Sequence, residues 1–138
     1  MLERIHEHII DELGQSARTD TIFVLTGIVF NLIVLGINSA VAGEASDSGN
    51  ASNDVILWVL IIMSLLINAI AITALQLGRR TRDKLLNGLM SMYRDNGVEQ
   101  YYDEALLKNY GRRYLLFSGV ILCLGFISIV IPLIVRWM

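Results

Sequence analysis

Four uncharged polar side chains lie inside long apolar runs of the sequence, where an amide or hydroxyl needs a hydrogen-bond partner. Asn31 and Asn38 are seven residues apart in one run, and Ser64 and Asn68 are four apart in another, so each pair shares one face of a helix. In hydrocarbon such side chains bond to a neighbouring helix or line a polar path. These residues therefore predict either interhelical hydrogen bonds or pore lining.

The sequence contains few other residues that are candidates for catalysis or metal binding. His6 and His8 are the two histidines, and alternate residues of a helix do not share a face, so both cannot bind one metal ion. Cys123 is the single cysteine and lies in an apolar run, where a thiol is not activated. No nucleotide-binding, zinc-protease or CxxC motif occurs. We therefore expect no catalytic site, metal or cofactor, and no enzyme.

Three uncharged apolar segments must position the polar residues. They are Thr21 to Ala42, Val55 to Leu77 and Tyr114 to Val135. Each has about 22 residues, so a helix of about 33 Å would cross a hydrocarbon core of about 30 Å. The sequence predicts an all-α integral membrane protein, one membrane domain over 1–138, with transmembrane helices at 20–42, 55–77 and 114–136. Asn31 and Asn68 are equally deep, so we expect them to come within hydrogen-bonding reach.

Basic residues gather on one side of this arrangement. Of the eleven Lys and Arg, only Arg136 lies beyond the third span, and the rest precede the first span or separate the second from the third. The positive-inside rule then places the N-terminus in the cytoplasm and the C-terminus outside. We expect the membrane to be a prokaryotic plasma membrane. The outer loop, 43–54, lacks Lys and Arg, favours turns and carries the acidic residues Glu44, Asp47 and Asp54.

Two segments are expected outside the membrane on the basic side. Residues 1–18 predict an amphipathic helix with an apolar stripe and acidic residues off that stripe. We favour packing of this helix against protein, with the basic segment after the second span as a candidate, and keep a shallow position on the membrane as the alternative. Residues 78–113 predict a cytoplasmic helical hairpin that turns at Asp95-Asn96-Gly97 and ends at Gly111. Its first arm starts with Arg79, Arg80 and Arg82.

This layout is similar to that of the small prokaryotic membrane diacylglycerol kinases. The family carries a glutamate-rich, metal-binding stretch through the end of its second span. The corresponding stretch here, "LINAIAITALQLGRRTRD", contains no glutamate. The resemblance is therefore confined to layout and implies no kinase activity.

Two functions remain open on the sequence. The first is a homo-oligomer that forms an ion- or solute-conducting pore, with Asn31 and Asn38 lining it and the acidic outer loop attracting cations to its mouth. The second is a non-catalytic membrane scaffold or accessory subunit whose cytoplasmic hairpin docks a protein partner. Both place the chain in a lipid bilayer, favour self-association and involve no nucleic acid.

Overall fold

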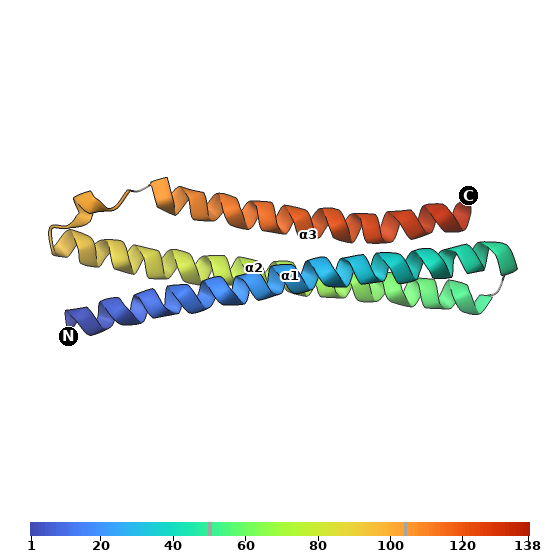
Figure 1. Cartoon of the computed structure of the whole chain (residues 1–138), viewed down its shortest axis with the longest axis horizontal. Helices are drawn as coiled ribbons and strands as arrows, with labels where there is room; N and C mark the ends of the chain where they lie inside the picture. Colours follow the sequence, from blue (N-terminus) through green and yellow to red (C-terminus); the bar gives the residue numbers. More distant parts are fainter. Residues whose placement is uncertain (50, 104) are drawn as a thin grey trace.

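The computed structural model describes residues 1–49, 51–103 and 105–138, with the backbone alone for 106 and 107. The described elements are the helices α1 (Leu2–Ser48), α2 (Ala51–Asp95) and α3 (Ala105–Trp137) and a short 3₁₀ helix, η1 (Glu99–Tyr101). The three long helices run along one axis and form a rod, with the N- and C-termini at opposite ends (Figure 1).

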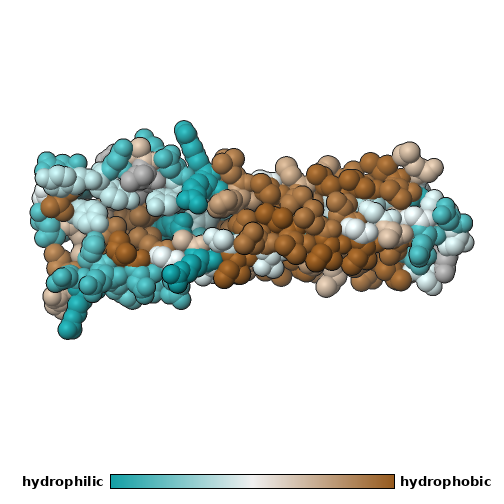
Figure 2. All heavy atoms as spheres, in the orientation of Figure 1, coloured by the Kyte–Doolittle hydropathy of each residue, from teal (hydrophilic) through white to brown (hydrophobic). Residues whose placement is uncertain are grey.

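All three long helices are long and apolar enough to cross a membrane. Figure 2 shows the hydrophobic surface as a band over one part of the rod, with hydrophilic surface beyond it on the side of the N-terminus. We call the band, residues 21–42, 55–77 and 114–135, the apolar belt. We call the hydrophilic part, residues 2–19, 78–103 and 105–113, the extension. The 47 residues of α1 span about 70 Å, so this helix alone is more than twice as long as a hydrocarbon core is thick.

The helices pack along a seam of buried positions that recur every three or four residues. In α1 the seam runs from Asp20 to Ala45, and in α2 from Leu57 to Met90. This spacing, close to 3.5 residues, is typical of helices that wrap around one another with a left-handed twist. The predicted polar residues Asn31, Asn38 and Asn68 lie on the seam, so packing of the bundle fixes where they point.

The predicted amphipathic helix and first span form one continuous helix, α1. No proline interrupts it near 18–20, and the buried Asp20 continues the seam from the belt to the edge of the extension. The first segment also lies against α2, because His6 Nε2 is 3.1 Å from the Tyr93 hydroxyl. The first segment thus contacts the segment after span two, and it is continuous with the helix that contains the first apolar segment.

The outer connection is much shorter than the expected loop at 43–54. Helix α1 continues to Ser48 and α2 starts at Ala51. Gly49 adopts a left-handed conformation with φ 60°, and its N–H donates to the carbonyl oxygen of Ala45 at 3.2 Å. Ala42 and Ala45 are fully buried, so packing keeps this segment helical despite its turn-favouring residues. Asn50 lies outside the described residues.

The expected hairpin at 78–113 is also divided differently. Its first arm is the continuation of α2, which ends at Asp95. Gly97 has φ 70°, and the Gly97 and Val98 N–H groups donate to the carbonyls of Arg94 and Tyr93, which is a Schellman cap. The second arm is η1 followed by the first turns of α3, which runs through Gly111 without ending. A Cβ atom at Gly111 would meet Arg79 Nη2 at 3.4 Å, about an ordinary contact distance, so this glycine packs beside Arg79 inside the helix instead of ending it.

Candidate functional site

Asn31 and Asn68 form a reciprocal pair of hydrogen bonds in the middle of the apolar belt. Each side-chain nitrogen donates to the side-chain oxygen of the other at 2.8 Å. The second hydrogen of each amide goes to a backbone carbonyl one turn earlier, from Asn31 to Gly27 and from Asn68 to Ser64, both at 2.8 Å. All four amide hydrogens are therefore used within the chain, as the equal depth of the two residues predicted.

The same network reaches α3 through two serines. The Ser64 and Ser128 hydroxyls are 3.3 Å apart, and Ser128 donates to the carbonyl of Gly125 at 2.9 Å. A side chain at Gly125 would lie 3.1 Å from the amide of Asn68, so α3 approaches this closely only because residue 125 is glycine. Ser64 and Asn68, which the sequence placed on one face of span two, thus connect all three helices.

Asn38 is different, although it lies on the same line of α1. It is fully buried, and neither its nitrogen nor its oxygen forms a hydrogen bond with any residue that the structure describes. An amide buried in this way is unfavourable, since it has given up solvation without gaining a partner. Asn31 and Asn38, which the sequence placed on one face of a helix, are thus both buried, but only Asn31 forms side-chain hydrogen bonds with described residues.

The acidic residues expected at the outer mouth differ in their surroundings. Asp54 is paired with Arg136, whose Nε and Nη2 donate to the two carboxylate oxygens at 2.6 and 3.0 Å. Glu44 and Asp47 are exposed on the last turns of α1. Arg136, which the sequence placed alone beyond the third span, thus ties the C-terminal turn of α3 to the start of α2.

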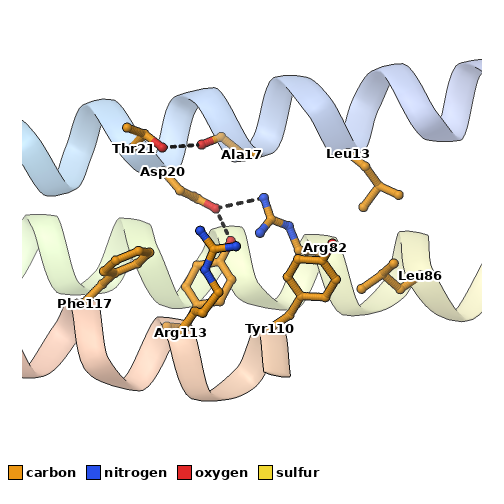
Figure 3. Close-up of a pocket in the computed structure, with 10 residues that line it drawn as sticks. Leu13, Ala17, Asp20, Thr21, Arg82, Leu86, Tyr110, Arg113 and Phe117 are labelled. Carbon is orange, nitrogen blue, oxygen red and sulfur yellow. Dashed lines mark hydrogen bonds and ion pairs between the residues drawn. The ribbon is translucent and has the colours of Figure 1, made fainter. Parts of the chain in front are cut away.

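A buried cluster of charged and aromatic groups lies where the belt meets the extension (Figure 3). Asp20 and Arg82 are only 7% and 8% exposed, and Arg82 Nη2 lies 3.4 Å from Asp20 Oδ2. The Tyr114 hydroxyl donates to the same carboxylate oxygen. The guanidinium of Arg82 also lies 5.4 Å from the ring centres of Tyr110 and Tyr114. Each of the three long helices contributes to this cluster.

Sequence reasoning missed this cluster because it looked for polar pairing only within the uncharged segments, which begin at Thr21, and counted Arg82 only among the cytoplasmic basic residues. Asp20 directly precedes the first apolar segment, Arg82 follows the second by five residues, and Tyr114 begins the third. Nearly equal depth was therefore a usable signal for Asp20 and Tyr114, but not for Arg82, which lies four residues farther from the segment edge than Asp20 does. The neighbouring Arg79 and Arg80 are exposed, and Arg79 forms a weak ion pair of 3.9 Å with Asp83.

No three His, Cys, Asp or Glu side chains converge as metal ligands in the described part of the chain. At the turn of the extension, hydrogen bonds from Arg94 hold the pKa of the exposed Glu99 carboxyl below its usual value. Such a pair fixes the turn and supplies neither a nucleophile nor a base. The polar groups described above form hydrogen bonds between the helices and surround a cavity at the edge of the belt.

The comparisons with known proteins supply no further assignment. The chain matches no protein-family model, no curated protein and no solved structure. Function must therefore be inferred from the geometry of this chain.

Proposed function

We propose that the protein is a non-catalytic membrane scaffold, or accessory subunit, whose extension docks a protein partner at its tip. The observation that carries this proposal is the distribution of polar and apolar groups. The central polar groups of the belt are paired inside one chain, whereas apolar groups are exposed at the end of the extension that is farthest from the belt.

The closed amide pair weakens the pore as an explanation. Asn31 and Asn38 are 1% and 0% exposed in the single chain, so an axis between neighbouring copies would not meet their side chains. Lining a pore between subunits would require α1 to rotate and the hydrogen bonds to Asn68 to break. The belt surface that remains is apolar, with exposed Ile, Leu and Val side chains that suit contact with lipid tails.

The tip of the extension has the features of a docking surface. Leu2 and Ile5 are 49% and 46% exposed, and across the turn Val98 and Tyr101 are 40% and 82% exposed. A cavity of about 380 Å³ lies beside them and is lined by residues that include His6 and Val98. Exposed apolar side chains in the hydrophilic part of a protein are typical of interaction sites.

The chemistry around the tip defines the kind of partner. Glu3, Glu7 and Asp11 are exposed along the same end of α1. A protein that presents apolar anchors with basic residues at their rim would complement this surface.

The experiment places a photo-crosslinking amino acid at Tyr101 in cells that make the protein natively. A matched probe at Asn87 serves as control, because Asn87 is exposed on α2 in the extension but is not among the tip residues. The proposal expects a discrete adduct from position 101, none from position 87, and loss of the adduct in a Leu2→Glu variant. A missing adduct at 101, or equal adducts at both positions, would contradict it. An adduct of twice the chain mass would identify a second copy and support self-association instead.

Docking from the cytoplasm requires that the extension lie on that side, as the distribution of Lys and Arg favours. In a Cys123→Ala background, Ser48→Cys and Asn96→Cys place thiols at exposed positions near opposite ends of the rod. We expect a membrane-impermeant maleimide to label position 48 in intact cells and position 96 only after the cells are opened. The reverse pattern would place the extension outside and refute a cytoplasmic partner.

A further inference from the structure

A cavity of about 210 Å³ lies between the three long helices at the edge of the apolar belt (Figure 3). Its polar lining includes Asp20, Arg82 and Arg113, and its apolar walls include Leu86 and Phe117. Because the belt begins at Thr21 and Tyr114, this depth corresponds to the region of lipid headgroups. A molecule bound here would therefore meet charged groups and an apolar wall together.

Arg82 retains donor capacity inside the cavity. Its Nη2 atom is buried and, although it lies 3.4 Å from Asp20 Oδ2 as an ion pair, it forms no hydrogen bond with a described residue. Asp20 shares that carboxylate oxygen with the Tyr114 hydroxyl. A guanidinium has five N–H donors, so a buried one with an unused donor favours an additional acceptor.

Arg113 adds a second positive charge at the mouth of the cavity. Its side chain is exposed, its guanidinium lies 5.9 Å from the ring centre of Phe117, and it forms no ion pair with a described carboxylate. The lining thus contains two guanidiniums and one carboxylate, which leaves one positive charge unmatched. The cavity consequently favours an anionic ligand.

We propose that this cavity binds the phosphate of an anionic phospholipid headgroup. Arg113 and the unused donor of Arg82 would donate to the phosphate oxygens, since guanidinium groups match phosphate in geometry and charge. Phe117, on the belt side of Arg113, would contact the first carbons of an acyl chain. Basic pockets between transmembrane helices at the inner face of a membrane bind such headgroups by the same chemistry. The site does not depend on the docking proposal, because it lies at the belt edge rather than at the tip.

The test compares Arg113→Gln with Arg112→Gln in purified full-length protein. Both residues are exposed and adjacent, and both substitutions remove one positive charge, but only Arg113 lines the cavity. Arg82 is unsuitable for the test, because its removal would leave Asp20 buried without its cation and destabilise the bundle. Phosphatidylglycerol and phosphatidylcholine are titrated separately into the detergent-solubilised protein, and bound lipid is counted by native mass spectrometry. Circular dichroism verifies that both variants are folded.

We expect the wild-type protein to prefer phosphatidylglycerol. Arg113→Gln should weaken that binding about fivefold or more, and Arg112→Gln should leave it nearly unchanged. If both variants lost the same affinity for phosphatidylglycerol, the binding would be explained by general charge attraction, and the proposed site would be refuted. Equal binding of both lipids would overturn it as well. Displacement of bound phosphatidylglycerol by millimolar inorganic phosphate would show that the cavity takes free phosphate, which would overturn the assignment to lipid.

Discussion

At the scale of single residues, the structure separates three intramembrane asparagines that look equivalent in the sequence. Asn31 and Asn68 satisfy each other, whereas Asn38 is buried without a described partner. A polar side chain in a membrane bundle stabilises it only when its hydrogen bonds are made, because the lipid alternative offers none. The three residues should therefore respond differently to the same substitution.

Asn31→Leu and Asn68→Leu should each lower the free energy of unfolding by about 0.6–2 kcal/mol, since each leaves the other amide without its partner. The double variant should lose less than the sum of the two single losses, because both substitutions remove the same bonds. Asn38→Leu, of similar size, should cause no loss, because no described hydrogen bond is removed. Unfolding in mixed micelles measures all four variants. A loss for Asn38→Leu as large as that for Asn31→Leu would contradict the assignment of partners.

Depth along the chain predicts some of the observed contacts. The contact between Asn31 and Asn68 follows from counting inward from the belt edge, and the same count places Asp20 beside Tyr114 but not Arg82, which lies five residues outside the belt. The face shared by Asn31 and Asn38 predicts burial but not the partner, because pairing depends on which residue of the facing helix lies at the same level. At the level of Asn38 no such partner is described.

At the scale of elements, close approach between helices depends on a few glycines of the seam. Gly125 is in contact with the Asn68 amide, whereas the space around Gly119 is open for at least 4 Å. Gly125→Ala should cost about 1–3 kcal/mol, because the new methyl group would push α3 from the amide pair. Gly119→Ala should be neutral or slightly stabilising, because alanine is the better helix former. Unfolding measurements that rank the two variants equally would contradict this packing.

The turn after α2 should respond to acid. Because Arg94 lowers the pKa of Glu99 in the folded turn, the pair stabilises the turn above the ordinary carboxyl value of 4.5, and this contribution is lost as the pH falls through the lowered pKa. A spin label at Gln100 should therefore become more mobile below about pH 4.5. In a Glu99→Gln variant the mobility should not change over the same pH range. A similar transition in that variant would assign the response to another group.

The sequence was enough to predict three long apolar helices, but it did not predict where each helix begins and ends. Three uncharged apolar segments are enough to indicate three spans. The sequence nevertheless predicts a helix boundary near residue 18, a loop at 43–54 and a helix end at Gly111, whereas the structure has helix through residue 18, over 43–48 and 51–54, and through Gly111. The reason is tertiary, since the burial of Asp20 and Ala45 and the packing of Gly111 beside Arg79 favour helix where local residues favour turns or ends.

At the scale of the whole molecule, the rod has a belt held together from within and an extension with an apolar tip. The amide groups of Asn31 and Asn68, which could line a conducting path, instead bond two helices to each other. The apolar side chains of the tip, which could bind a partner, are exposed. The proposed scaffold and the proposed lipid site use different parts of this rod, so each can fail without the other. The central claim is that the paired amides of Asn31 and Asn68 hold the bundle closed rather than line a path.

Flux through proteoliposomes tests that claim most directly. The wild-type protein and the Asn31→Leu and Asn38→Leu variants are reconstituted at equal density, and release of several ions and small solutes is compared with release from protein-free liposomes. A closed bundle predicts that all three proteins release no more than protein-free liposomes do. Flux through the wild-type protein that both substitutions reduce would show that the asparagines line a conducting path, and it would contradict the account.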